Sequence, residues 1–245
     1  PRSWRGLCTR KKAGAQPARG YARRVREVIG PADWLPVDAL LDRLILGEDS
    51  ALSAALADSQ SAGLPPIEVS RQSARLLYLL TKLTGARRVL EIGTLGGFST
   101  ICLARGVGAE GAVVTLEYDP RHAEVAARNL DRAGLADRVD IVVGEALAIL
   151  PGLTGVFDLV FIDADKENNT AYVRHAIRLG RPGTVIVVDN AVRAGRILDP
   201  AAEDLQARGV REMLEFVGDN PRLEAAGIQT VGAKGWDGIV VARVT

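Results

Sequence analysis

The chain has 245 residues, of which 47% are hydrophobic, and it carries a formal net charge of +1 at pH 7. A chain of this length and composition can bury a full core, so we expect one soluble globular domain, and a disordered protein is excluded. Apolar runs in the sequence fall short of the roughly 20 residues that cross a bilayer, which argues against a membrane partner. Cys8 and Cys102 lie far apart and do not suggest a disulfide framework, so we expect a reducing, cytoplasmic location.

The small net charge hides a basic N-terminus. Residues 1–27 contain nine lysines and arginines and a single acidic residue, Glu27, so the rest of the chain is acidic. Such an arm could contact nucleic acid or serve as a transit peptide, but we favour a solvated, flexible segment over residues 1–30 that is partly non-native. The acidic body argues further against nucleic acid as a partner.

The first predicted elements are helices over residues 31–84. Leucine and alanine recur at helical spacing between residues 31 and 64, and a Gly-Leu-Pro-Pro break follows at residues 63–66. Ser70 suits the N-cap of a second helix, which ends before the core over residues 85–245.

Strands and helices alternate along this core. We expect strands at residues 88–93, 112–117, 138–143, 157–163 and 184–189. We expect helices at residues 97–106, 120–133, 145–151, 168–180 and 203–218. Short apolar runs such as TVIVV are typical of strands buried on both faces. The alternation therefore indicates a parallel sheet with right-handed crossovers and helices on both faces.

The C-terminal end departs from this alternation. Residues 223–232 and 236–244 read as two strands joined by a glycine-rich turn with no helix between them, which predicts a hairpin and an antiparallel last strand. The predicted fold class is α/β, a Rossmann-like, mostly parallel, seven-stranded sheet. Because ligands of such sheets lie beyond the carboxyl ends of the strands, functional residues should directly follow the strands.

A glycine-rich turn follows the first predicted strand, within residues 89–119. Gly93, Gly96 and Gly97 let the backbone approach a ligand closely, and the next helix presents its amide-rich end there. Glu117, at the end of the second strand, suits the two hydroxyls of a ribose. The spacing differs from GxGxxG because the second glycine is displaced. We therefore expect an adenosine-containing cofactor and disfavour NAD.

Oxygen-bearing side chains follow two later strands. Asp163 ends one predicted strand, and Asp189 and Asn190 end the next. Oxygen ligands suit a hard divalent cation such as Mg²⁺ or Ca²⁺ and not zinc. Lys166 lies three residues beyond Asp163, and near a cation an ammonium group loses proton affinity and can serve as a base. The alternatives to a metal site and a catalytic base are that Asp189 only begins the turn that ends its strand and that Lys166 is a surface lysine.

The remaining reactive residues do not form a recognisable constellation. His122 and His175 lie in predicted helices, and neither belongs to a recognisable Ser/His/Asp or Cys/His catalytic arrangement. We therefore expect surface or structural roles for both. Cys102 falls in the helix after the glycine turn and is expected in the core.

These motifs resemble those of the cation-dependent class I O-methyltransferases, the family of catechol and caffeoyl-CoA O-methyltransferases and their bacterial relatives. The bacterial members that act on small phenolic or natural-product substrates look most similar. The resemblance covers residues 64–245. It rests on PPIEVS, VLEIGTLGGFST, VVTLEYDPRHAEVAARNL, FDLVFIDADKENN and VIVVDN. It implies that the helices before residue 85 cover the active site or form a homodimer.

The resemblance also implies roles for individual residues. The residues implied to hold the methionine part of S-adenosylmethionine are Val69, Glu91, Gly93, Thr94 and Ser99, and Asp163 is implied to lie near the cofactor as well. Glu117 would bind the ribose hydroxyls, and the backbone of Ala146 would contact the adenine. The implied ligands of Mg²⁺, or of another divalent cation such as Ca²⁺ or Mn²⁺, are Asp163, Asp189 and Asn190. Lys166 would take the substrate proton, so that Asp163 and Lys166 are the implied catalytic residues.

The resemblance ends at the substrate side of the site. The acidic residue with which the animal catechol enzymes hold the second hydroxyl has no match, and GAKGWDG stands in this region. We therefore hypothesise an S-adenosylmethionine- and divalent-cation-dependent O-methyltransferase that acts on a small catechol-like or other vicinal-hydroxyl molecule.

Other functions stay open from the sequence. A nicotinamide-dependent oxidoreductase on a Rossmann sheet is one alternative, and a non-catalytic cofactor-binding interaction module is another. Nucleic-acid methylation is disfavoured, because IDADK stands where amino-methylating enzymes carry an Asn-Pro-Pro-Tyr-type turn.

Overall fold

The computed structural model describes residues 30–245, and the basic arm over residues 1–29 lies outside the described part. The α-helices are α1 (Pro31–Leu41), α2 (Ser50–Ser61), α3 (Arg71–Leu83), α4 (Phe98–Val107), α5 (Pro120–Arg132), α6 (Ala146–Ile149), α7 (Asn169–Leu179) and α8 (Leu205–Asp219). The strands are β1 (Arg88–Ile92), β2 (Ala112–Glu117), β3 (Val139–Val143), β4 (Leu159–Ile162), β5 (Val185–Asp189), β6 (Leu223–Gly232) and β7 (Gly235–Val244). The short helical turns are η2 (Asp42–Leu46), η3 (Ala136–Arg138), η4 (Leu150–Gly152), η5 (Lys166–Asn168) and η6 (Arg193–Leu198).

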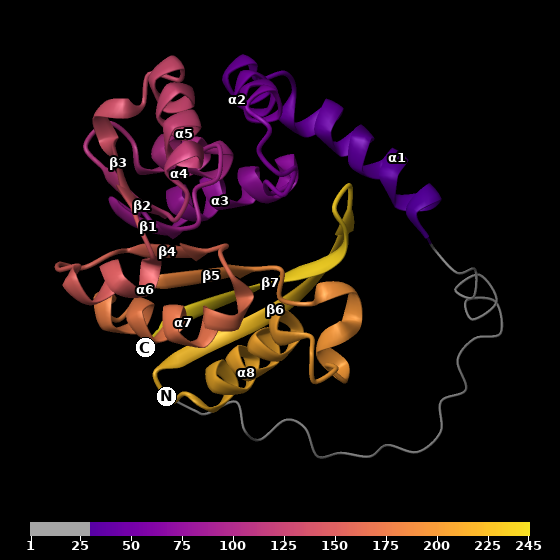
Figure 1. Cartoon of the computed structure of the whole chain (residues 1–245), viewed down its shortest axis with the longest axis vertical. Helices are drawn as coiled ribbons and strands as arrows, with labels where there is room; N and C mark the ends of the chain where they lie inside the picture. Colours follow the sequence, from indigo (N-terminus) through magenta and orange to yellow (C-terminus); the bar gives the residue numbers. More distant parts are fainter. Residues whose placement is uncertain (1–29) are drawn as a thin grey trace.

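The strands form one seven-stranded sheet in the order β3-β2-β1-β4-β5-β7-β6 (Figure 1). The pairings from β3 to β5 are parallel, whereas β7 runs antiparallel to both β5 and β6. The predicted mostly parallel sheet with an antiparallel last strand is therefore confirmed. The strand order reverses between β1 and β4, and such a switch point opens a crevice at the carboxyl ends of the strands.

Helices cover both faces of the sheet. Alternate residues of one strand point to opposite faces. Leu90 and Ile92 of β1 therefore pack in the cluster that contains the apolar residues of α7 and α8. Val89 of the same strand packs in the cluster that contains residues of α2, α3 and α4. Within residues 30–245, no helix is both long and apolar enough to span a membrane.

The N-terminal helices stay outside the sheet, as Figure 1 shows for α1 and α2. The predicted helical stretch over residues 31–64 is wrong at its centre, because the chain breaks after η2. Gly47 adopts φ +67°, which ends η2, and the Asp49 side chain accepts the Leu52 N–H at 3.1 Å and so caps α2. The break turns α1 toward the tip of the β6–β7 hairpin, where the Asp38 Oδ2 atom accepts the Ala233 N–H at 2.8 Å.

Candidate functional site

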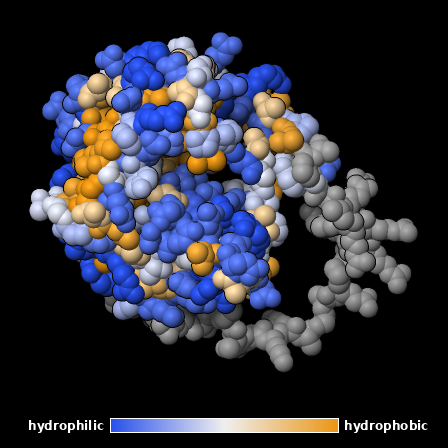
Figure 2. All heavy atoms as spheres, in the orientation of Figure 1, coloured by the Kyte–Doolittle hydropathy of each residue, from blue (hydrophilic) through white to orange (hydrophobic). Residues whose placement is uncertain are grey.

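A cleft of about 1270 Å³ opens at the carboxyl ends of the parallel strands. Its walls come from the glycine turn, the ends of β2, β4 and β5, helix α1 and the β6–β7 hairpin. In Figure 2 the surface is hollowed beside α1, and hydrophilic residues predominate around the hollow. The predicted site residues that line the cleft are Val69, Gly93, Thr94, Ser99, Glu117, Ala146, Asp163, Lys166, Asp189 and Asn190. Residues up to 121 positions apart in the sequence, from Val69 to Asn190, are thus brought together at one site.

Gly93 allows the ends of β1 and β4 to meet at the floor of the cleft. Its φ is +98°, and a Cβ atom added to it would lie 2.1 Å from the Asp163 carbonyl oxygen. Only glycine fits both requirements. Gly97, with φ +82°, then forms the N-cap position of α4, so the free amides of that helix face the cleft.

Glu117 is held at the end of β2 by backbone amides. Its Oε2 atom accepts the N–H groups of Thr94 at 3.1 Å and Leu95 at 2.7 Å, and its Oε1 atom accepts the Asp119 N–H at 3.0 Å. The residue is only 7% exposed, yet it borders the cleft. A carboxylate fixed in this way suits a ligand with hydroxyl donors.

Glu91 lies behind the cleft wall and not on it. The residue is 0% exposed, and the hydroxyls of Ser99, Thr100 and Thr115 donate to its carboxylate at 2.6, 2.5 and 2.7 Å. Burial raises the pKa of Glu91 to about 7, against the lowering effect of these hydrogen bonds. In this geometry Glu91 orients Ser99, which does line the cleft.

Asp163, Lys166, Asp189 and Asn190 meet where β4 and β5 end. The two strands are parallel neighbours, so residues that follow them emerge at the same edge. Burial, and then the charge of Asp163, raise the pKa of Asp189 to about 7. The Lys166 Nζ atom donates to Asp163 Oδ1 at 2.7 Å, and Lys166 is 6% exposed.

The donor chemistry of this group fits a hard divalent cation. Two carboxylates and an amide supply oxygen atoms only, and a cation would offset the like charges that oppose each other here. Within the described residues no group of three or more His, Cys, Asp or Glu side chains is arranged to hold a metal. The candidate set therefore depends on the Asn190 oxygen as its third donor.

The sequence analysis missed several residues that line the cleft, among them Tyr118, His122, Tyr172 and Arg193. His122 was expected at the surface, but its Nδ1 atom lies 3.4 Å from Glu117 Oε1. The signal was available, because the first turn of a helix that follows a strand end faces the ligand side of such a sheet. Tyr172 is buried, and its hydroxyl donates to Asp165 Oδ1 at 2.5 Å.

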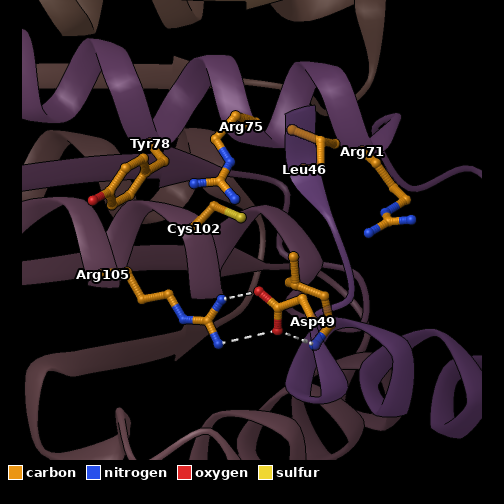
Figure 3. Close-up of a pocket in the computed structure, with 8 residues that line it drawn as sticks. Leu46, Asp49, Arg71, Arg75, Tyr78, Cys102 and Arg105 are labelled. Carbon is orange, nitrogen blue, oxygen red and sulfur yellow. Dashed lines mark hydrogen bonds and ion pairs between the residues drawn. The ribbon is translucent and has the colours of Figure 1, made fainter. Parts of the chain in front are cut away.

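A second, smaller cavity of about 340 Å³ lies between α3, α4 and the start of α2, and it shares no lining residue with the cleft. Figure 3 shows Arg75 and Tyr78 on one side of it and the Asp49–Arg105 ion pair on the other. The Arg105 Nη1 atom lies 2.6 Å from Asp49 Oδ2. Cys102 points into this cavity, and burial raises the pKa of its thiol to about 12, which agrees with the expected core position.

Known proteins are similar to this chain in both sequence and fold. The sequence model of the O-methyltransferase family matches residues 48–244. A catechol O-methyltransferase of Mycobacterium tuberculosis is 61% identical over 85% of this chain and 94% of the relative.

Two solved structures have the same fold as this chain. The O-methyltransferase of Bacillus cereus in complex with S-adenosylhomocysteine has a TM-score of 0.85 at 44% identity, over 86% of this chain and 98% of that one. The O-methyltransferase TomG of Streptomyces achromogenes, involved in tomaymycin synthesis and in complex with S-adenosylmethionine, has a TM-score of 0.84 at 44% identity, over 86% and 97%. The family match, the high identity and the shared fold together establish that the chain belongs to the O-methyltransferase family.

Proposed function

We propose that this chain transfers the methyl group of S-adenosylmethionine to one hydroxyl of a small catechol-like substrate with the help of a divalent cation. The observation that carries the proposal is that the amide-held carboxylate of Glu117 and the Asp163–Asp189–Asn190 oxygen group border the same cleft. In this proposal the cofactor binds in one half of the cleft and the substrate in the other half. Family membership favours this reaction over hydride transfer to a nicotinamide.

The cofactor half uses the glycine turn and the end of β2. Glu117 accepts the ribose hydroxyls, because three backbone amides hold its carboxylate in one orientation. Val69, Gly93, Thr94 and Ser99 border the methionine part, and Ala146 borders the adenine. Glu91 contributes through the hydroxyl of Ser99 that it holds, without direct contact.

The substrate half uses the ends of β4 and β5. Asp163, Asp189 and Asn190 would hold the divalent cation, which when bound supplies Lewis acidity to the hydroxyl oxygens of the substrate, while S-adenosylmethionine supplies the electrophilic methyl group. Lys166, in its neutral amine form, accepts the proton of the attacking hydroxyl, since its Nζ atom lies at the cleft wall beside Asp163. Alignment of the reacting atoms by these fixed groups supplies much of the rate gain.

Methyl transfer to catechol tests the proposal. The protein is incubated with S-adenosylmethionine, catechol and Mg²⁺, and the monomethylated product is measured by mass spectrometry. We expect turnover with Mg²⁺, loss of turnover in EDTA, and recovery when Mg²⁺ is added back. Binding of S-adenosylhomocysteine, measured by calorimetry, should persist in EDTA. Turnover that EDTA leaves intact would contradict the metal half, and absence of both turnover and cofactor binding would contradict the whole proposal.

We also propose that the chain forms a homodimer through its N-terminal helices and that it works in the cytoplasm. Support for the dimer comes from large apolar side chains left exposed there, including Leu44 and Ile45 at 65% and Leu83 at 81%. Exposed apolar patches mark protein–protein contacts, and a dimer would bury these side chains. Sedimentation at micromolar concentration checks the proposal, and a purely monomeric species would contradict it.

A further inference from the structure

We propose that Arg193 binds a carboxylate group of the substrate, so that the preferred substrates are vicinal-dihydroxy aromatics that carry an acid. This inference rests on the proposed methyl transfer and names the substrate class of the same site. Arg193 begins η6, three residues after Asn190, and lines the cleft together with Gln206 of α8.

The charges that line the cleft single out Arg193. Lys166 pairs with Asp163 at 2.7 Å, and Lys234 pairs with Glu68 at 2.9 Å. Arg193 donates instead to the Oε1 atom of Gln206, which is a neutral amide. Among residues 30–245, Arg193 forms no ion pair, so its positive charge is available to a ligand.

The guanidinium group also has an unused donor. The Nε atom of Arg193 is buried and has no hydrogen-bond partner within the described part of the chain. A buried donor left unpaired is unfavourable, so an acceptor is expected there when the site is in use. A carboxylate accepts two parallel hydrogen bonds from one arginine, which matches this planar, forked donor set better than a single hydroxyl does.

The backbone around Arg193 is held in an uncommon conformation. Arg193 and Ala194 both have φ +53°, a region that non-glycine residues rarely adopt. The Oδ1 atom of Asp237 accepts the N–H groups of Val192 and Arg193 and so stabilises this turn. A conformation that is costly in itself and specifically supported is characteristic of a functional position.

The location of Arg193 suits the distal part of a substrate. If two vicinal hydroxyls lie at the Asp163–Asp189–Asn190 group, the rest of the aromatic molecule extends along the cleft, whose wall continues into η6 and the β6–β7 hairpin. An acidic substituent there would meet the guanidinium. An uncharged substituent could not form this charged hydrogen bond. Asp237 lies on the same wall, but its Oδ1 atom already accepts three backbone N–H groups.

Paired substrates test the inference. We compare kcat/KM for 3,4-dihydroxybenzoate and for its methyl ester, which has nearly the same shape without the charge. Arg193→Met should lower the ratio of the acid to the ester by about 10–100-fold, mainly through KM, as expected for the loss of a charged hydrogen bond. Arg193→Lys should restore part of the ratio. The matched control is Arg196→Met, because Arg196 lies on the same turn, pairs with Asp204 and does not line the cleft.

Binding of the acid and of the ester is also measured by calorimetry with S-adenosylhomocysteine and Mg²⁺ present, so that the result does not depend on turnover. Equal losses for acid and ester in Arg193→Met, or no loss for the acid, would overturn the role of Arg193. Failure of the wild-type protein to methylate catechol, the acid and the ester would contradict the proposed function, while selective binding of the acid would still support the role of Arg193.

Discussion

Asp237 fixes the backbone of Arg193 from 44 positions further along the chain: its Oδ1 atom accepts the Arg193 N–H at 2.9 Å. The same oxygen accepts the N–H groups of Val192 at 3.0 Å and Gly238 at 2.9 Å. The first residues of η6 are thus tied to β7, and the turn beside the oxygen group depends on one carboxylate.

Replacing Asp237 should therefore loosen this turn. Asp237→Ala leaves three backbone donors without an acceptor, and we expect the free energy of unfolding to fall by about 2 kcal/mol, since each unpaired buried donor is costly. Asp237→Asn keeps an acceptor oxygen and should cost less. Urea unfolding of both variants checks this order, and an Asp237→Ala protein as stable as Asp237→Asn would contradict it.

Glu91 should make stability depend on pH. The folded chain holds the Glu91 proton up to about pH 7, whereas the ordinary glutamate pKa of the unfolded chain is 4.5. Between these values the unfolded chain binds fewer protons, so the Glu91 contribution to stability falls as pH rises through this window and then levels off. Glu91→Gln should therefore gain stability relative to the wild type from pH 4.5 to 7.

Urea unfolding at several pH values measures that difference. The matched control is Glu124→Gln, which changes an exposed glutamate of α5. A stability difference between Glu91→Gln and wild type that stays constant with pH would show that burial does not raise the pKa of Glu91.

Gly93→Ala should damage both the fold and the site. The new methyl group would lie 2.1 Å from the Asp163 carbonyl oxygen at φ +98°, so we expect a loss of about 2–4 kcal/mol from the clash and the backbone strain together. Gly134→Ala is the control, because its φ is +67° but nothing lies within 4 Å of the added atom. It should cost about 1 kcal/mol. Thermal unfolding of the two variants compares them, and equal losses would refute the close approach.

Lys166→Met should slow methyl transfer without removing the cofactor site. Loss of a general base lowers turnover by about 10²–10⁴-fold. Single-turnover kinetics with catechol measure this step, and calorimetry with S-adenosylhomocysteine serves as the control for folding. Turnover close to wild type would exclude Lys166 as the proton acceptor.

The second cavity offers a test of stability alone. Asp49 both caps α2 and pairs with Arg105, so Asp49→Ala removes two interactions and should cost about 1–2 kcal/mol. Arg105→Ala removes only the partly exposed ion pair and should cost less than about 1 kcal/mol. Urea unfolding gives the two values. Equal losses in the two variants would show that the cap adds nothing to the ion pair, and a larger loss in Arg105→Ala would contradict both assignments.

The sequence predicts the sheet and the principal strand-end residues because both follow from local rules. Apolar runs mark β1 to β5. Residues that follow parallel strands must lie at the same edge of the sheet, so the sequence alone places Asp163 and Asp189 near each other. Glu91 illustrates the limit. Strand alternation turns its side chain away from the cleft, toward the hydroxyls of Ser99, Thr100 and Thr115.

Other features depend on contacts between distant segments. Arg193 takes its conformation from Asp237, and no local pattern predicts a left-handed backbone at arginine. The break at Gly47 and Asp49 was visible as glycine next to a capping residue, but the regular spacing of leucines on either side masked it. The place of His122 in the first turn of α5 indicates the ligand side of the sheet, but its contact with Glu117 could not be read from the sequence.

The contact between Asp38 of α1 and Ala233 of the β6–β7 hairpin joins residues 195 positions apart. The hairpin is the last of the described elements to be synthesised, and a domain generally folds as a unit. The wall that α1 and the hairpin share can therefore close only when both ends of the described chain are present. Truncation at either end would open the substrate side of the cleft.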